Sequence, residues 1–392
     1  MTPAARVQAA IELLDEIIEA ARSKGAPADR LIAAYFKQRR YAGSKDRRAV
    51  RELVYRAVRH SGPVPKSGRA AMLALAEVDD TLRALFAGSP HGPQVIGADE
   101  PVAETGLAPE WLVKKLEKSD ISGEGAASLL SRAPFDIRVN ALKADRDTLE
   151  LPEAGERLVA PNALRFPTGT NVEPWPAFRQ GLIEVQDHGS QLICEAIPAC
   201  SGDTVLDLCA GAGGKTLALA ARFGNAISLM AADTDKRRLG NLAPRSARAG
   251  AAIDRIILLD PGREMEALEG LKGNVDHVLV DAPCSGTGTW RRNPEGRWRL
   301  DPAELARLTK LQDHVLDIAA ALVRPGGTVT FVTCSVLDDE GPDRISVFLE
   351  RHPRFENEAL DMPLGTPRGG GIRLEPFRDG TDGFFIATAR LA

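Results

Sequence analysis

The sequence lacks the features that would place the protein in a membrane or in an oxidising compartment. No apolar run approaches the roughly 18 to 20 residues needed to cross a bilayer, and the first residues lack the basic start and apolar core of a signal peptide. The cysteines are odd in number and form no CxxC pair, which argues against a disulfide framework and a zinc site. We therefore expect a cytoplasmic monomer with reduced thiols that binds neither a membrane nor a metal. These thiols are Cys194, Cys200, Cys209, Cys284 and Cys334.

A strong overall charge is also absent, because the net charge is only −4, but the charges are unevenly distributed. Residues 1–70 carry 15 Lys or Arg against 7 Asp or Glu, and the stretch from Phe36 to Arg69 carries 11 against 2. A charge run is more often a solvated helix face, but this one is also a plausible phosphate-binding surface. At its centre are Lys37, Arg39, Arg40, Lys45, Arg47, Arg48, Arg51, Arg56 and Arg59.

The periodicity of apolar residues divides the 392 residues into three parts. Residues 1–130 show three- and four-residue spacing, which predicts an all-helical domain, and the basic residues described above favour RNA binding by it. Residues 131–190 contain one clear strand and many turn formers, which favours a small α/β connecting module. In residues 191–392 short apolar strands alternate with helical segments, the pattern of a doubly wound, Rossmann-like α/β domain. We expect its strands at 204–209, 227–233, 255–260, 275–281, 328–334 and 383–389, and a helix at 302–322.

A glycine-rich turn follows the first of these strands, where open α/β sheets bind nucleotides. The loop that we expect to contact the cofactor contains Cys209, Ala210, Gly211, Ala212, Gly213, Gly214 and Lys215. It imitates a P-loop, but that motif requires a glycine at position 209, so an NTPase is excluded. A dinucleotide-dependent dehydrogenase stays possible, because Asp233 could bind ribose hydroxyls in either class. Asp207 favours a methyltransferase, since a carboxylate suits a sulfonium cofactor better than a pyrophosphate.

Two cysteines follow neighbouring strands of the expected sheet. Asp281-Ala-Pro-Cys284 ends one strand and Thr333-Cys334-Ser335 ends the next, so both thiols should face the ligand crevice. Carbon 5 of a cytosine is a poor nucleophile, and a thiolate that adds to carbon 6 turns it into an enamine. Asp281 could stabilise the protonated intermediate, and Lys215 could steer charge nearby. A free cysteine is usually just a small buried apolar residue, but that reading is much weaker for two at adjacent strand ends.

These segments resemble the RNA 5-methylcytosine methyltransferases of the Sun/Fmu type, in particular the bacterial small-subunit ribosomal RNA enzymes. The resemblance covers residues 130–392 and includes Arg138 to Lys143 and Phe178 to Gln191. It implies S-adenosylmethionine as cofactor, RNA as partner, Cys334 as nucleophile and Cys284 as the thiol that assists release. The spacing alone would allow either order of the two cysteines.

The resemblance also implies the cofactor contacts. These are Cys209 to Lys215, Asp233, Arg238, Asp260 and Asp281. The chain departs from the family pattern in its glycine loop, where Gly-Ala replaces Ala-Pro, and at Pro244, which we expect to kink or end a helix.

The basic N-terminal part resembles the antitermination-factor-like domain of the ribosomal members, which favours 16S ribosomal RNA as the substrate. Arg291, Arg292, Arg297 and Arg299 are expected to add phosphate contacts, beside Trp290 and Trp298. Three alternatives stay open at this point: methylation of transfer RNA by the same chemistry, methylation of an exocyclic amine, and a non-catalytic ribosome-assembly factor that only binds RNA.

Overall fold

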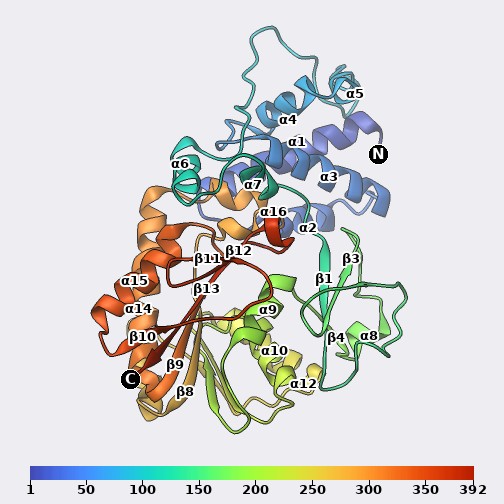
Figure 1. Ribbon diagram of the computed structural model, residues 1–392. Coiled ribbons are helices and arrows are strands. Elements are labelled where there is room, and N and C mark those ends of the chain that lie inside the picture. The colour runs from blue at the N-terminus through green and yellow to red at the C-terminus, as the bar shows by residue number, and fades with distance from the viewer. The chain divides into compact units, whose positions relative to one another are not determined.

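The computed structural model describes residues 1–392, which form two compact units (Figure 1). The helical unit consists of residues 1–131 and 289–302, and the sheet unit consists of residues 132–288 and 303–392. The division expected from the sequence did not foresee that residues 289–302, which lie within the expected methyltransferase domain, are part of the helical unit.

The first residues of the helical unit form an amphipathic helix because their apolar side chains repeat every three or four positions. Helix α1 (Pro3–Arg22) buries Val7, Ile11 and Leu14 among the other helices, and the side chain of Thr2 caps its first turn. The remaining helices are α2 (Ala28–Gln38), α3 (Ser44–His60), α4 (Gly68–Glu77), α5 (Asp80–Arg83), α6 (Glu110–Lys118) and α7 (Gly123–Ser128). The all-helical N-terminal part predicted from the sequence is confirmed.

Residues 289–302 pack into this helical unit as a buried plug. Trp298 belongs to its apolar core, and Arg297 is fully buried, with its guanidinium donating to the backbone carbonyls of Val58 and Ser61. Arg299 donates to the carbonyls of Gly25 and Ala26. The short helix η3 (Pro294–Trp298) provides the turn that places these side chains.

The predicted role of this arginine cluster in binding phosphate is therefore wrong for Arg297 and unsupported for Arg299. Their donors are used by carbonyl groups of the protein, which a buried cation needs in place of water. Burial also lowers the pKa of Arg297. Arg291 is buried as well, whereas Arg292 and Arg299 keep intermediate exposure.

A small antiparallel sheet opens the sheet unit. It has the strand order β2-β3-β1-β4, and β1 pairs with both β3 and β4. The strands are β1 (Phe135–Val139), β2 (Glu156–Arg157), β3 (Ala163–Phe166) and β4 (Ile183–Val185), with the short helix α8 (Pro176–Arg179) before β4. The buried Asn140 side chain donates to the carbonyls of Gly181 and Ala249, which joins this sheet to the rest of the unit.

The large sheet has the order β11-β12-β13-β9-β8-β5-β6-β7. Its parallel strands are β5 (Thr204–Asp207), β6 (Ser228–Asp233), β7 (Arg255–Leu258), β8 (Val275–Asp281) and β9 (Val323–Thr333), and β13 (Phe384–Leu391) is antiparallel to β9. The Rossmann-like α/β class is confirmed. The sequence missed three short strands at the antiparallel edge: β10 (Phe355–Glu358), β11 (Thr366–Arg368) and β12 (Gly371–Leu374).

Helices cover both faces of this sheet (Figure 1). One face packs against α14 (Pro302–Leu322) and α15 (Pro342–Arg351), and the other against α9 (His188–Ala196) and α10 (Gly214–Arg222). The shorter helices are α11 (Lys236–Leu239), α12 (Leu242–Ala249), α13 (Glu264–Leu268), η1 (Glu269–Leu271), η2 (Thr287–Thr289), η4 (Asp338–Glu340) and α16 (Pro376–Asp379).

Pro244 was predicted to kink or end the helix after β6, and that helix is divided just before it rather than kinked at it. The chain leaves α11 at Gly240 and starts α12 at Leu242, so Pro244 lies in the first turn of a new helix. A proline is well tolerated there, because amide groups of the first turn have no partner within the helix.

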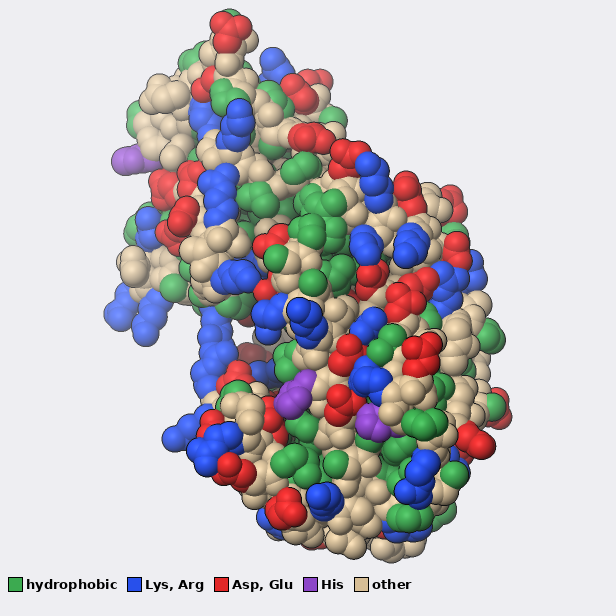
Figure 2. All heavy atoms as spheres, turned by 90° about the vertical axis from the view of Figure 1, so that its left-hand side faces the viewer, with side chains coloured by type: hydrophobic (Ala, Val, Ile, Leu, Met, Phe, Trp, Pro, Cys, Tyr) green, Lys and Arg blue, Asp and Glu red, His purple; other side chains and the backbone are tan.

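None of the helices is both long enough and apolar enough to pass through a bilayer. On the face drawn in Figure 2, Lys and Arg side chains are interspersed with Asp and Glu side chains.

Candidate active site

The glycine loop between β5 and α10 turns sharply because two of its glycines have left-handed backbone conformations. Gly211 has φ +56° and Gly213 has φ +83°. A Cβ atom on Gly213 would come within 2.1 Å of Leu242 Cδ1, and one on Gly211 within 2.4 Å of the Arg238 guanidinium. Only glycine fits these positions without movement of a neighbour, which fixes the path of the loop.

Two strand-end carboxylates hold this loop. Asp233, at the end of β6, accepts a hydrogen bond from the Gly211 amide at 2.7 Å. Asp207, at the end of β5, accepts one from the Thr216 hydroxyl at 2.6 Å through Oδ2, while its buried Oδ1 has no partner. Burial raises the pKa of Asp207 to about 7, and the nearby charges of Asp281 and Asp233 act in the same direction.

A cavity of about 420 Å³ opens beside the carboxyl ends of the strands. Its charged lining residues are one cation, Arg238, and four carboxylates, Asp233, Asp235, Glu264 and Asp281. The remaining lining is largely apolar. It consists of Leu208, Cys209, Thr234, Leu259, Ala282, Pro283, Cys284, Leu311, Val315, Ile318 and Cys334. The cavity therefore favours a ligand with a flat apolar part and a positive charge.

The structure brings together most, but not all, of the residues predicted to contact the cofactor. Cys209, Asp233, Arg238 and Asp281 line the cavity, whereas residues 210–215 do not. Asp260 lies outside it and is exposed, because β7 ends two residues earlier, at Leu258.

Glu264 lines the cavity instead, and the sequence reasoning missed it. It accepts a hydrogen bond from the Gly262 amide at 3.0 Å and contacts His314 Nε2 at 3.2 Å. A glutamate at the start of a helix is usually an ordinary surface residue, so no sequence pattern marked this position as part of the cavity.

The thiols of Cys284 and Cys334 lie at the rim of this cavity, with their sulfur atoms 3.3 Å apart. They follow β8 and β9, which are adjacent parallel strands with Asp281 paired to Val332. The hydrogen bond with Cys334, burial, and the charges of Cys334 and Glu340 together raise the pKa of Cys284 well above its usual value. The raised pKa keeps Cys284 in its thiol form at neutral pH.

A buried network fixes the two cysteine turns to each other. The carboxylate of the fully buried Glu340 accepts hydrogen bonds from the Ser285 amide at 2.8 Å, from the Ser285 hydroxyl, and from Gln312 Nε2 at 3.0 Å. The Thr287 and Ser335 hydroxyls lie 2.9 Å apart, and the Gly288 amide donates to the Cys334 carbonyl. Because these groups are buried and paired, the sulfur–sulfur distance is held by the surrounding structure.

Asp281 forms an ion pair with Lys215, from the first turn of α10. Lys215 Nζ lies 2.6 Å from Asp281 Oδ2 and 5.6 Å from the ring centroid of Phe384. Burial alone would lower the pKa of Lys215, but the charge of Asp281 outweighs it and the net shift is upward. The ammonium group is therefore retained and orients the carboxylate beside the two thiols.

Comparisons with known proteins agree with this geometry. Residues 196–390 match the protein family described as 16S rRNA methyltransferase RsmB/F. The chain is 34% identical over 300 residues to the probable ribosomal RNA small subunit methyltransferase B of Bacillus subtilis (strain 168), and 35% identical over 289 residues to the ribosomal RNA small subunit methyltransferase B of Enterobacter sp. (strain 638). Each match covers 72% of this chain and 66% of the relative, so the chain spans slightly less than two thirds of the length of these relatives.

Solved structures agree on the fold. The crystal structure of PH0851 superimposes with a TM-score of 0.74 at 25% identity, covering 100% of this chain and 99% of that chain. A methyltransferase homolog protein from Pyrococcus horikoshii gives a TM-score of 0.59 at 24% identity, covering 72% and 99%. The resemblance inferred from the motifs is confirmed: residues 196–390, which contain the glycine loop and both cysteine turns, belong to the 16S rRNA methyltransferase RsmB/F family.

Proposed function

We propose that this protein transfers a methyl group from S-adenosylmethionine to carbon 5 of a cytosine in small-subunit ribosomal RNA. The observation that carries the proposal is the pair of thiols 3.3 Å apart at the rim of a cavity, beside the Lys215–Asp281 ion pair. The names of the relatives support ribosomal RNA as the substrate.

The chain's own residues fit this cofactor. An apolar wall that includes Leu259, Val315 and Ile318 suits an adenine ring, and Asp233 suits ribose hydroxyls. The excess of carboxylates in the cavity suits a cationic sulfonium. When bound, the cofactor supplies an electrophilic methyl group on its sulfonium sulfur.

The attack on the base is assigned to Cys334. The Cys334 sulfur, 3.3 Å from the Cys284 sulfur, supplies the electron pair that forms a bond to carbon 6 of the cytosine, and the proton of its thiol passes to solvent. Asp281, held in place by Lys215, is positioned to hydrogen-bond the ring nitrogen or exocyclic amine and to stabilise the charge that develops there. Carbon 5 thereby becomes nucleophilic.

Release of the product is assisted by Cys284. After methyl transfer, solvent accepts the proton of carbon 5, the electron pair of that bond restores the double bond between carbons 5 and 6, and the bond between carbon 6 and the Cys334 sulfur breaks, which returns its electron pair to that sulfur. Cys284 is the titratable group in contact with this sulfur. The division of labour between the two thiols rests on the family resemblance, and their mutual contact is compatible with it.

The proposal is tested with two cysteine variants and one matched control. Cys334→Ala should abolish transfer to 16S ribosomal RNA, whereas Cys284→Ala should accumulate a covalent protein–RNA adduct, seen as a slower band on a denaturing gel. Cys200→Ala removes an exposed thiol outside the cavity and should leave activity unchanged. An active Cys334→Ala enzyme would refute the mechanism.

A second measurement identifies the product and the RNA. Mass spectrometry of nuclease digests should locate the new methyl group on carbon 5 of cytosine. Parallel reactions with 16S ribosomal RNA and with transfer RNA transcripts should favour the former. A methyl group on the exocyclic amine would overturn the reaction, and faster transfer to transfer RNA would overturn the substrate.

A further inference from the structure

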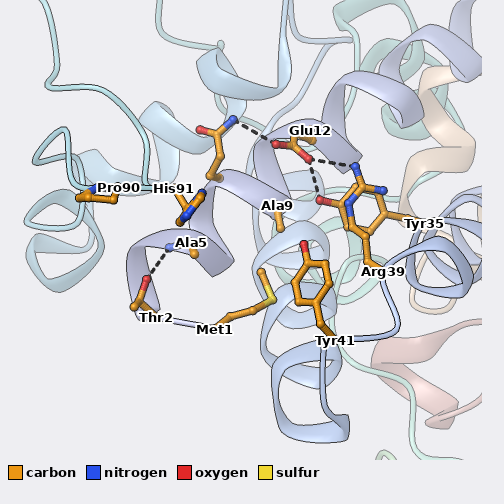
Figure 3. Close-up of a pocket in the computed structure, with 11 residues that line it drawn as sticks. Met1, Thr2, Ala5, Ala9, Glu12, Tyr35, Arg39, Tyr41, Pro90 and His91 are labelled. Atoms are coloured by element: carbon orange, nitrogen blue, oxygen red, sulfur yellow. Dashed lines mark hydrogen bonds and ion pairs between the residues drawn. The ribbon is translucent and has the colours of Figure 1, made fainter.

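A second cavity, of about 660 Å³, lies in the helical unit and takes no part in the proposed methyl transfer. Figure 3 shows Tyr35, Arg39 and Tyr41 on one side of it, and Pro90 and His91 on the other. Its volume falls within the range of about 300–1,000 Å³ that is typical of sites for small ligands. The cavity is therefore large enough to hold a nucleotide.

The aromatic side chains of this cavity offer flat surfaces for a base. Tyr41 is 74% exposed, the largest exposure among the exposed apolar and aromatic side chains. Next to it, the Arg39 guanidinium stacks on the Tyr35 ring at 3.5 Å from the centroid, and the Tyr35 hydroxyl donates to Glu12 at 2.7 Å. One face of the Tyr35 ring is thus covered by Arg39, whereas the Tyr41 ring has no aromatic or cationic group stacked on it.

Cations without acidic partners lie close to Tyr41 in the sequence, on both sides of it. Lys37, Arg40, Lys45 and Arg48 are all exposed and form no ion pair. The acidic residue of this stretch, Asp46, is already paired with Arg6 at 2.8 Å. Exposed cations interleaved with an exposed aromatic ring are the composition of surfaces that bind single-stranded nucleic acid.

The edge of the cavity provides polar groups for a base. The Glu12 carboxylate, which Tyr35 and Arg39 hold in place, can accept from a ring nitrogen or an exocyclic amine. Gln8 lies beside it, with its Nε2 3.4 Å from Glu12 Oε1, and offers both a donor and an acceptor. A stacking ring, a polar edge and nearby cations match the three parts of a nucleotide.

We propose that this cavity binds one unpaired nucleotide of an RNA strand, with its base stacked on Tyr41 and the neighbouring phosphates on Lys37, Arg40, Lys45 and Arg48. The inference rests on the proposed function in that RNA is the substrate. It adds a second recognition site, in the helical unit, for an unpaired base that is not the one methylated.

The test compares Tyr41→Ala with Tyr41→Phe in the full chain. Binding of a fluorescein-labelled, twelve-nucleotide single-stranded RNA is measured by anisotropy, without cofactor. Loss of one base–aromatic stack should weaken binding roughly 5- to 140-fold for Tyr41→Ala, whereas Tyr41→Phe keeps the ring and should bind as the wild type does. Phe377→Ala, which removes an exposed ring of the sheet unit, is the matched control and should have no effect.

Two further RNA probes separate stacking from charge. The Tyr41→Ala defect should disappear when the same strand is annealed into a duplex, because paired bases cannot stack on the ring. Lys45→Ala should instead reduce the slope of log affinity against log salt by about 0.7, as expected for one lost phosphate contact to a single strand. A Tyr41→Ala protein that binds the single strand with wild-type affinity overturns the inference.

The outcome is distinguishable from failure of the proposed function. If the wild type methylates 16S ribosomal RNA and Tyr41→Ala binds the single strand with wild-type affinity, the nucleotide site is refuted and the enzyme assignment is kept. If Tyr41→Ala binds the single strand more weakly but the wild type transfers no methyl group, the nucleotide site is supported and the enzyme assignment is refuted.

Discussion

Replacing Glu340 tests whether one buried carboxylate holds the two cysteine turns together. Glu340→Ala leaves the amide and hydroxyl of Ser285 and the Nε2 group of Gln312 buried without their acceptor. Hydrogen bonds to a charged group contribute about 1.5–3 kcal/mol each, and their loss is not additive, so we expect the free energy of unfolding to fall by about 3–5 kcal/mol. For a unit of this size the thermal midpoint should then drop by roughly 6–20 °C.

Glu340→Gln separates charge from position. Its amide oxygen can keep the bonds from the Ser285 amide and from Gln312, and its amide group can donate to the Ser285 hydroxyl, so the stability should change by only about 1 kcal/mol. The negative charge that helps to raise the pKa of Cys284 is removed, however. The pH at which the thiol pair reacts with iodoacetamide should therefore move downward.

The assays are thermal denaturation, initial rates of methyl transfer, and thiol alkylation as a function of pH followed by mass spectrometry. Glu350→Ala, an exposed glutamate on α15, serves as the control and should behave as the wild type in all three. The reasoning is refuted if Glu340→Ala unfolds at the wild-type temperature and transfers methyl groups at the wild-type rate.

Three further changes test other parts of the structure. Arg297→Met should destabilise the helical unit by about 3–5 kcal/mol in a denaturant titration, because it leaves buried carbonyl groups without donors. Asp207→Asn should raise the thermal midpoint at pH 8. Burial raises the folded-state pKa of this acid to about 7, so the wild type loses stability as the pH rises from about 4 to 7, whereas the variant carries no charge to bury. The stability gained by the variant should therefore vanish below pH 4. Gly213→Ala should weaken cofactor binding measured by calorimetry, because its Cβ would meet Leu242, whereas Gly270→Ala has open space and should not.

The strongly apolar elements were predictable from the sequence. Strand β8 and helix α14 have the predicted bounds, and β5, β6 and β9 end within two residues of the predictions, because long buried runs dominate their local pattern. The adjacency of the two cysteine turns followed from the same reasoning, since parallel strand ends meet at one edge of a sheet.

What the sequence could not predict depends on tertiary contacts. Glu340 stands in the run Asp338-Asp339-Glu340, which reads as a solvated turn, and only the folded chain reveals that its carboxylate is fully buried. Strand β11 contains Pro367 and lies at the sheet edge, where short polar strands have weak periodicity. Arg297 looked like a surface cation because arginine is rarely buried without an acidic partner.

The plug formed by residues 289–302 limits how this protein can be dissected. The chain passes between the two units at three places, after Ser131, after Gly288 and after Pro302, so no single cut separates them. A fragment starting at Arg132 would retain the plug but lose the helices that bury Trp298. Such a fragment should aggregate. If residues 289–302 are replaced in it by a short flexible linker, the sheet unit should fold without the helical unit. Gene fusions that exchange the N-terminal half between relatives would have to exchange this internal stretch as well.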